Sequence, residues 1–418
     1  MADVTMADVT GTPETSASGL LADLADVGRD RSRGGYSRHV FDTAEIDLRE
    51  WFADQARRRG LDVEHDRNGN LWAWWGAPGP DAVVTGSHLD SVPGGGAFDG
   101  PLGVVSALSA VDILRERGAA PAKPLAVVVF GEEEGGRFGV PCLGSRLLTG
   151  SLPAEKALRL RDPEGITFAD AARRGGLDPE RIGADPELVG RIGRFVELHV
   201  EQGRGLIDLG GPVAVGSTVI AHGRWRLTFA GQGNHAGATP MDDRRDPMLP
   251  AAETVAAVRR IASSVPGTRA TVGRITPNPG GTNVIASTVD VWLDARGPDT
   301  ASVVADVEAA ARAAAEAEGC TVDLREESWS DEVVFDAALR DAVSAELGGV
   351  PALPTGAGHD AAVLAAHAPA AMLYVRNPTG VSHAPEEYAE DSDVDAGAEA
   401  LATVLARLSE GADWGAGR

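Results

Sequence analysis

The chain has very few cysteines and very few lysines. Cys142 and Cys320 are the two cysteines among 418 residues, so a disulfide framework is excluded and a reducing compartment is favoured. We therefore expect a cytoplasmic protein. Lys123 and Lys156 are the lysines, and every other basic side chain of the Lys/Arg kind is arginine, which we attribute to coding bias.

Positive charge and long hydrophobic runs are also scarce. The sequence has 38 basic against 62 acidic residues, a formal net charge of −24, which disfavours nucleic acid and anionic membranes as partners. No uninterrupted apolar run approaches transmembrane length. The N-terminal MADVTMADVT has neither the basic nor the apolar region of a signal peptide, and residues 1–18 are predicted to be a disordered tail.

Apolar runs alternate with helical patterns along most of the chain. The runs at 82–84, 125–130 (LAVVVF) and 194–200 (RFVELHV) are typical of buried strands, and 103–117 is predicted to be a helix. This alternation predicts an α/β fold with a mixed, mostly parallel sheet flanked by helices. In such sheets ligands bind beyond the carboxyl ends of the strands.

Two local signals add detail to this pattern. The stretch 42–59 is predicted to be a helix with a capping box made by Asp42 and Glu45, ended by Gly60. Asn68-Gly69 is a favoured hairpin dipeptide, so residues 63–75 are predicted to form two paired strands.

The pattern changes near residue 219. Residues 224–230 (RWRLTFA) alternate polar and apolar side chains, as in a half-exposed antiparallel strand. The order β-α-β-β-α-β that follows predicts one sheet with two helices, an α+β unit. We expect residues 219–330 to be a domain inserted into the α/β domain, which would comprise 19–218 and 331–418.

The stretch 84–103 (VTGSHLDSVPGGGAFDGPLG) holds the first candidate site residues. His88 and Asp90 are two apart on an extended segment, so both side chains point to one side. The glycines that follow allow a tight turn that returns Asp99 to the same point. A polar strand end followed by an ordinary glycine turn explains this stretch equally well when it is considered alone.

A second acidic cluster, Glu132 to Glu134, directly follows the apolar strand 125–130. Adjacent carboxylates at the mouth of a buried strand are costly unless a cation binds them; a solvated charge run is the alternative. Candidate metal ligands lie at strand ends or in the loops after them: His88, Asp99, Glu134, His199 and His383. A His/carboxylate set suits Zn, Mn, Co or Ni, and five ligands suit two ions that share a carboxylate. Glu133 is then the natural general base.

Seven ordered motifs carry a resemblance to a known family. They are GSHLDSVPGGGAFDGPLGV, EEEGGRF, ELHVEQG, GNHAGATPM, NVIASTVDVWLDAR, GAGHDA and GVSHAPEE. Over residues 20–410 the sequence resembles the hydantoinase/carbamoylase branch of the aminoacylase–carboxypeptidase type of dinuclear metallohydrolases. That branch includes N-carbamoyl-L-amino acid hydrolases, β-ureidopropionases and allantoate amidohydrolases. The resemblance implies a zinc-exopeptidase-like catalytic domain with a ferredoxin-like inserted lid, which also forms a homodimer.

The resemblance also implies roles for individual residues. Asp99 would bridge two divalent metal ions, His88 and His199 would complete one site, and Glu134 and His383 the other. Asp90 would hydrogen-bond His88. The remaining implied residues act on the substrate: Arg296 would bind its carboxylate with support from Asn283, Gln202 and His359 would contact the ureido group or carboxylate, and His235 of a partner subunit would stabilise the oxyanion.

The expected function is metal-dependent hydrolysis of the ureido C–N bond of a small carboxylate, with release of CO2 and ammonia. The residues do not choose between allantoate and an N-carbamoyl-L-amino acid. An aminoacylase or dipeptidase that cleaves an acyl amide is the first alternative, although His199 in place of a carboxylate argues against it. A non-catalytic carboxylate-binding protein is the second, and no ligand or base is missing from the sequence to favour it.

Overall fold

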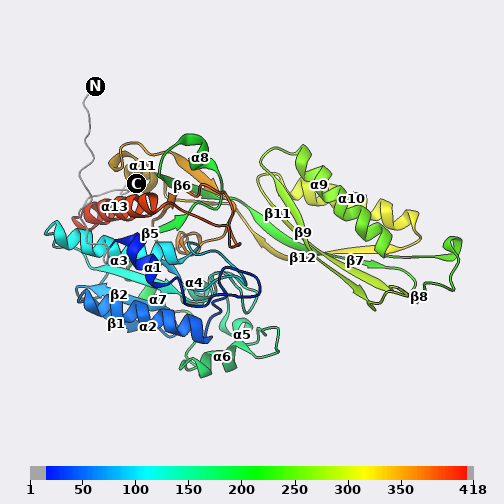
Figure 1. Ribbon diagram of the computed structural model, residues 1–418, viewed down its shortest axis with the longest axis horizontal. Helices are drawn as coiled ribbons and strands as arrows, with labels where there is room; N and C mark the ends of the chain where they lie inside the picture. The colour runs from blue at the N-terminus through cyan, green and yellow to red at the C-terminus, as the bar shows by residue number, and fades with distance from the viewer. Residues whose placement is uncertain (1–15, 412–418) are drawn as a thin grey trace. The chain divides into compact units, whose positions relative to one another are not determined.

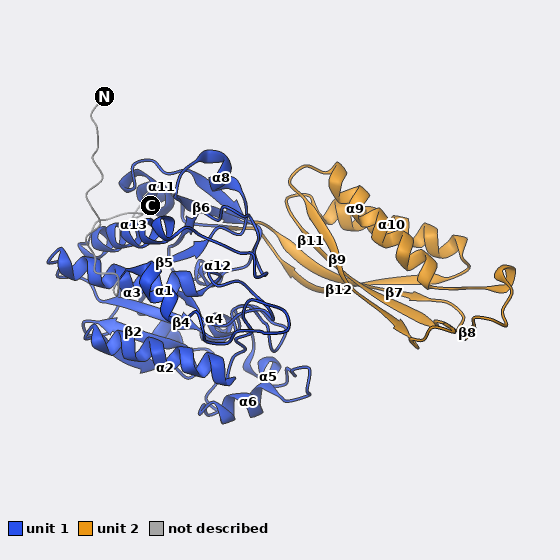
Figure 2. Ribbon diagram, in the orientation of Figure 1, with its two compact units in different colours: residues 1–219, 334–418 blue, residues 220–333 orange. Residues whose placement is uncertain are grey.

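The computed structural model describes residues 16–411 of the chain. These residues form two compact units, residues up to 219 together with those from 334 onward, and residues 220–333 (Figure 2). Residues 1–15 of the predicted tail lie outside the described residues. Residues 16–18 begin helix α1 (Ala17–Asp23), whose N-cap Ser16 accepts the backbone N–H of Gly19 through its hydroxyl oxygen, so the tail was predicted too long.

The first unit is built on one sheet of nine strands (Figure 1). In spatial order they are β1 (Asp62–His65), β2 (Leu71–Trp75), β4 (Leu125–Phe130), β3 (Ala82–His88), β5 (Ile192–Val200), β15 (Ala370–Val375), β6 (Val213–Val219) and β13 (Val333–Val334), with β14 (Ala352–Thr355) beside β6. The neighbours β4, β3, β5 and β15 run parallel, whereas β2 and β6 pair antiparallel with this group. The predicted mixed, mostly parallel sheet is confirmed.

Helices cover this sheet because its strands are apolar on both faces. Every residue of β3 and β4 is buried. One large core contains residues of α1, α2 (Thr43–Arg58), α3 (Pro101–Glu116), α11 (Ala337–Glu346) and α13 (Asp391–Ser409) together with strand residues. The shorter helices are α4 (Leu143–Thr149), α5 (Ala154–Ala157), α6 (Phe168–Arg174), α7 (Pro186–Val189), α8 (Gly205–Leu209) and α12 (Asp360–Leu364).

Helix α3 packs unusually close to the strands that carry the site. A Cβ at Gly103, in its first turn, would lie 2.3 Å from the carbonyl oxygen of Leu198 and 2.7 Å from the Cβ of Ser87. A side chain at position 103 would therefore push the helix away from both strands. Gly103 thus fixes the start of α3, and with it Asp99, against the ends of β3 and β5.

The local signals of the sequence had mixed outcomes. The hairpin is confirmed, since β1 and β2 pair antiparallel across the turn at Asn68-Gly69. The capping box is wrong: Asp42 makes no side-chain bond to the helix. Glu45 instead accepts the backbone N–H of Phe41 at 2.9 Å and pairs with Arg49. The Arg49 guanidinium balances the charge of this buried carboxylate.

The second unit contains a four-stranded antiparallel sheet in the order β12 (Thr321–Ser330), β7 (His222–Ala230), β11 (Thr288–Arg296) and β9 (Arg269–Asn278). Helices α9 (Met248–Ser264) and α10 (Thr300–Ala317) share a core with the alternate, buried residues of these strands. A 3-10 turn (Met241–Asp243) and two short paired strands, β8 (Asn234–His235) and β10 (Val284–Ile285), complete it. The order of elements follows the predicted β-α-β-β-α-β pattern.

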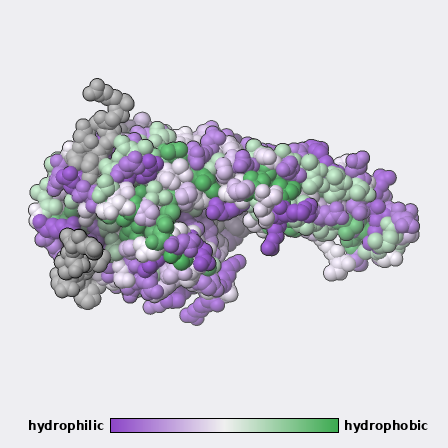
Figure 3. Space-filling model, turned by 90° about the horizontal axis from the view of Figure 1, so that it is seen from above, coloured by the Kyte–Doolittle hydropathy of each residue, from purple (hydrophilic) through white to green (hydrophobic). Residues whose placement is uncertain are grey.

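The surface is mixed in polarity. Figure 3 shows hydrophilic residues over much of one face, with smaller hydrophobic groups among them. None of the described helices is both long and apolar enough to cross a membrane.

Candidate metal centre

The candidate ligands of the first unit come from the ends of the four parallel strands or the segments after them. His88 is the last residue of β3, and His199 is the penultimate residue of β5. Glu134 follows β4, and His383 lies in the segment after β15. The carboxyl ends of parallel neighbours meet at one edge of a sheet, which is why residues far apart in sequence lie together here.

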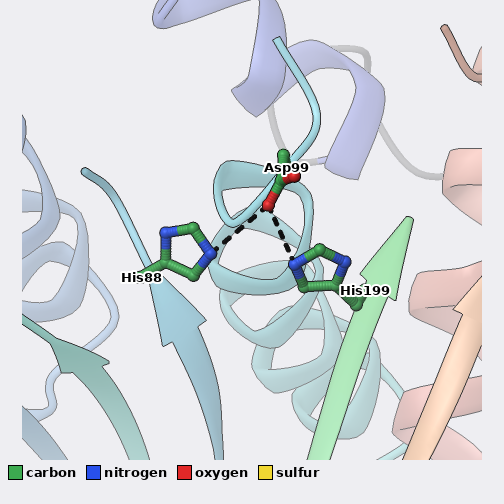
Figure 4. A group of neighbouring side chains, drawn as sticks. All are labelled: His88, Asp99 and His199. Atoms are coloured by element: carbon green, nitrogen blue, oxygen red, sulfur yellow. Dashed lines mark ion pairs between the residues drawn. The ribbon is translucent and has the colours of Figure 1, made fainter. Parts of the chain in front are cut away.

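Asp99 lies between two groups of side chains. Its Oδ1 is 3.5 Å from His88 Nε2 and 3.2 Å from His199 Nε2 (Figure 4). Its Oδ2 is 3.4 Å from His383 Nε2, which is also 3.3 Å from the Glu134 carboxylate. Each oxygen of one carboxylate therefore faces a different pair of ligand-type residues.

These groups have the composition and spacing of metal sites. His88, Asp99 and His199 offer ligand atoms that all lie within 4.8 Å of one another, and so do Asp99, Glu134 and His383. The Nε2 atoms of His88 and His199 are buried and make no hydrogen bond within residues 16–411. Buried polar atoms without partners are rare, so histidine nitrogens directed at a carboxylate fit divalent cations such as zinc or manganese.

The charges of this centre also fit a bound cation. Burial raises the pKa of Glu134 to about 7, and the nearby Asp99 carboxylate adds to the rise. Burial opposes ionisation of Asp99 as well, but His199, His383 and His88 hold its pKa well below the usual range. Carboxylates confined in this way are stabilised by positive charge, so the residues present fit metal ions.

Two of the three candidate histidine ligands are oriented by a backbone carbonyl. Nδ1 of His88 is 3.0 Å from the carbonyl oxygen of Asp90, and Nδ1 of His199 is 3.0 Å from that of Val200. These contacts fix Nδ1–H as the donor and leave Nε2 for a metal. Asp90 thus contacts His88 as expected, but through its main chain.

The carboxylate of Asp90 has another task. Its two oxygens accept the backbone N–H groups of Glu133 and Glu134, each at 3.1 Å. Its Oδ1 is farther from His88 Nδ1, at 3.7 Å. Asp90 therefore ties the end of β3 to the acidic turn after β4.

Glu133 is placed as a base would be. It is 5% exposed, and its Oε2 lies 3.6 Å from His88 Nε2. Burial raises its pKa well above the usual range; His88 opposes this, whereas the carboxylates of Asp360 and Glu134 reinforce it. A carboxylate with raised proton affinity beside the ligands can accept a proton and return it.

Two predicted substrate residues of this unit also lie here. Gln202 Nε2 donates to Asp99 Oδ2 at 2.8 Å, a contact the sequence did not suggest. His359 is 2% exposed, its ring centre is 4.5 Å from that of His199, and its Nε2 has no hydrogen-bond partner among the described residues. Burial holds the pKa of His359 well below the usual range, and the nearby His199 lowers it further, which favours the neutral imidazole.

The other three predicted residues belong to the second unit. His235 is exposed on β8, and its Nδ1 accepts the backbone N–H of Gly237 at 3.1 Å. The backbone carbonyl oxygen of Asn283 accepts the backbone N–H of Ala236 at 3.0 Å, so Asn283 and His235 lie on adjoining segments. Arg296 is the last residue of β11.

Arg296 pairs with a carboxylate of its own strand. Its Nε and Nη2 donate to the two oxygens of Asp294 at 2.7 and 3.0 Å. Residues two apart on a strand share a face, and this pair lies opposite to the buried Leu293 and Ala295. The contact with Asp294 is therefore bidentate, the geometry in which arginine typically binds a carboxylate.

Sequence reasoning missed two buried acids beside the centre. Glu387 is 4% exposed and accepts the backbone N–H groups of Phe98 and Asp99, each at 2.9 Å. Glu197 is fully buried in β5 and accepts from Ser87 Oγ and the Ala361 N–H. An acid two residues before His199, within an apolar strand, was a signal for Glu197; Glu387 had no comparable signal.

The fold and the site define a hydrolase of a known family. Residues 84–407 match the family model described as Peptidase family M20/M25/M40, and the chain belongs to this family. It is 41% identical over 405 residues to the N-carbamoyl-L-amino acid amidohydrolase of Geobacillus stearothermophilus, an alignment that covers 94% of this chain and 97% of that one.

Two further relatives agree with this assignment. The chain is 31% identical to the allantoate amidohydrolase of Escherichia coli (strain K12), over 92% of this chain and 96% of that one. The crystal structure of a hydantoinase/carbamoylase family amidase from Burkholderia vietnamiensis has a TM-score of 0.83 at 32% identity and covers 96% of this chain and 99% of its own. The predicted family and the predicted class, a hydrolase of C–N bonds other than peptide bonds, are confirmed.

Proposed function

We propose that this enzyme hydrolyses the ureido C–N bond of an N-carbamoyl-L-amino acid or of allantoate, and that it acts in the cytoplasm. The observation that carries the proposal is Asp99, whose two oxygens face His88 with His199 and His383 with Glu134. The relatives named N-carbamoyl-L-amino acid amidohydrolase and allantoate amidohydrolase support the choice of substrates.

The proposed centre would hold two divalent ions, and Asp99 would contribute a carboxylate oxygen to each of the two groups of ligands. His88 and His199 would hold one ion, and Glu134 and His383 the other. Ions in such a centre polarise the ureido carbonyl and acidify the attacking water. Zinc, manganese, cobalt and nickel all suit these ligands.

Glu133 acts as the general base and then as the general acid. Its carboxylate takes a proton as water adds to the ureido carbon, and it then gives that proton to the leaving nitrogen as the C–N bond breaks. The products are an amine and a carbamate, which decomposes to CO2 and ammonia. Asp90 holds the backbone of Glu133 and so keeps the base at the ligands.

The second unit supplies substrate recognition in this proposal. Arg296, with Asn283, binds the substrate carboxylate, while Gln202 and His359 of the first unit contact the ureido group or the carboxylate. The N–H of Gly237 donates to His235 Nδ1, which leaves Nε2–H as the donor for an oxyanion. We infer that residues 219–330 act as a lid and dimer interface, and that His235 serves the site of a partner subunit.

Exposed apolar side chains support dimerisation through the second unit. Met241 is 70% exposed, and Leu249 and Ile275 are each 44% exposed. Large apolar side chains on a surface are common at subunit interfaces.

The test is ammonia release by metal-loaded protein. Allantoate and N-carbamoyl-L-methionine are offered side by side, with amine release from N-acetyl-L-methionine as the third arm. We expect release from one or both ureido substrates and a loss of about a hundredfold or more in Glu133→Gln. Turnover of the acetyl compound alone would replace the proposal with the aminoacylase alternative.

A further inference from the structure

Cys142 lies against the acidic turn that carries the proposed base. It immediately precedes α4. The backbone N–H groups of residues 142, 143 and 144 donate in order to the carbonyl oxygens of residues 133, 132 and 131, at 2.6, 3.1 and 2.9 Å. The start of α4 is therefore bound along the whole turn, so the Cys142 side chain has a fixed place beside Glu133.

The thiol of Cys142 contacts the Glu133 carboxylate directly. Sγ donates to Oε1 at 3.2 Å, while Oε2 lies 3.6 Å from His88 Nε2. Cys142 is 2% exposed and Glu133 is 5% exposed. The two carboxylate oxygens are thus distinguished: one faces sulfur, and the other faces a candidate metal ligand.

We propose that Cys142 is a positioning residue for Glu133, whose thiol holds Oε1 so that Oε2 is presented to the metal ligands and the attacking water. The terminal torsion of a glutamate side chain has a broad energy profile, so a carboxylate at a centre of this kind needs a partner to fix its plane. The inference rests on the proposed role of Glu133 as the base.

The sulfur is a donor in this contact. Burial raises the pKa of the Cys142 thiol well above the usual range, and the charges of Glu133 and Asp360 raise it further. The group therefore keeps its proton, and an S–H is a weak hydrogen-bond donor. A thiolate at the same position would repel the carboxylate.

The second cysteine provides a matched control. Cys320 is 8% exposed in the core of the second unit, and its Sγ lies 3.6 Å from the carbonyl oxygen of Glu318. It is a buried thiol that touches a backbone carbonyl and no carboxylate in the described residues. If Cys142 only fills space, its S–H band and the kcat of its variants should respond as those of Cys320 do. If Cys142 positions Glu133, the two cysteines should differ in both measurements.

The contact can be tested without activity by the infrared S–H stretching band of the full-length protein. Cys142→Ser and Cys320→Ser each remove one band and so assign both. We expect Glu133→Ala to move the Cys142 band to higher frequency, because it removes the acceptor whether or not Glu133 is ionised, and to leave the Cys320 band in place. A Cys142 band that Glu133→Ala does not move would overturn the proposal.

The consequence for catalysis is tested with Cys142→Ala, Cys142→Ser and Cys320→Ala. We expect Cys142→Ala to lose about two- to tenfold in kcat, the rate equivalent of one weak hydrogen bond, with KM unchanged. Cys142→Ser keeps a donor and should restore most of kcat, and Cys320→Ala should match the wild type. Cys142 has a left-handed backbone, with φ 54°, and because serine and alanine both carry a Cβ, we expect similar backbone strain in the two variants.

The outcomes separate the two proposals. Equal kcat in Cys142→Ala and the wild type, or equal losses in the alanine and serine variants, would overturn the positioning role. A wild-type protein that cleaves neither ureido substrate would overturn the proposed function, whereas the infrared result would still decide whether the thiol holds the carboxylate.

Discussion

The carboxylate of Glu387 accepts the backbone N–H of Asp99 at 2.9 Å, across 288 residues of sequence. The same carboxylate accepts the N–H of Phe98 and the hydroxyl of Ser382 at 2.9 and 3.2 Å. Ser382 precedes the candidate ligand His383. Glu387 therefore connects the loop of Asp99 to the loop of His383.

We predict that Glu387→Ala weakens metal binding about ten- to a hundredfold, the usual effect of removing a group that orients a metal ligand. Glu387→Gln keeps an amide oxygen for the two N–H groups and should lose less. Competition with a chelating dye measures the affinity. The neighbouring Glu386 is exposed, so Glu386→Ala is the control, and an equal loss in that variant would contradict the prediction.

Metal stoichiometry tests the arrangement of the ligands. Since His383 is near one oxygen of Asp99 only, His383→Ala should lower the metal content from about two ions per chain to about one. Asp99→Ala should abolish it, because both groups lose a ligand. Elemental analysis after dialysis gives the ratio, with the exposed His367→Ala as control; a single ion in the wild type would refute the prediction.

Substrate affinity should depend on the guanidinium of Arg296. The guanidinium of Arg296 makes a bidentate contact with Asp294. A lysine ammonium cannot make such a contact, so we expect that lysine cannot replace Arg296. We expect Arg296→Lys to lower kcat/KM about ten- to a hundredfold, mainly through KM. Arg274, stacked on Trp292 at 4.3 Å on the same sheet, gives the control Arg274→Ala. Unchanged KM in Arg296→Lys would exclude the carboxylate-binding role.

Mixing two inactive variants tests whether His235 acts across a dimer. Neither His235→Ala nor Glu133→Gln should turn over substrate alone. If a site takes Glu133 from one subunit and His235 from the other, exchange of subunits creates intact sites and about a quarter of the wild-type activity. Steady-state assays after co-incubation measure this recovery, and its absence despite exchange would show that both residues act within one chain.

Asp30 should make stability depend on pH. Hydrogen bonds from the hydroxyls of Ser32 and Ser37 and from the backbone N–H groups of Arg33 and Ser32 lower its pKa below the ordinary value. A carboxylate with a depressed folded-state pKa stabilises the fold above its unfolded pKa of about 4, and this contribution is lost as the pH falls further.

The corresponding variant is Asp30→Asn. Its midpoint of denaturant unfolding should lie below that of the wild type at neutral pH, and the gap should shrink progressively below about pH 4. Asp26→Asn, an exposed acid that pairs with Arg29 at 3.6 Å, should show a smaller gap. A gap for Asp30→Asn that is constant with pH would rule out this source of stability.

The sequence could predict that the candidate ligands lie together because their signal is local. An apolar strand that ends in His88, or in the acidic turn Glu132–Glu134, can be recognised from a few consecutive residues. The parallel sheet then brings the ends of these strands together. Paired strands, the helix α9 and the inserted order of elements follow from the same short periodic patterns.

The supporting groups could not be predicted because they depend on side-chain direction. Glu386 and Glu387 are adjacent residues of the same type, yet Glu386 is exposed and Glu387 is buried against Asp99. Likewise the sequence placed Asp90 near His88 but could not show that its carboxylate would turn to the backbone of Glu133 and Glu134. The Cys142 contact depends on a left-handed residue before α4, which no local pattern indicated.

The position of β15 has a consequence for synthesis on the ribosome. β15 lies between β5 and β6, so the last long strand to be translated must fit between two that were made before the whole second unit. Residues 220–333 are contiguous, and we expect nascent chains truncated after Asp336 to protect them from protease while the first unit stays sensitive. The candidate ligand His383 emerges later still, so the candidate metal centre would be completed only after the whole second unit has been made.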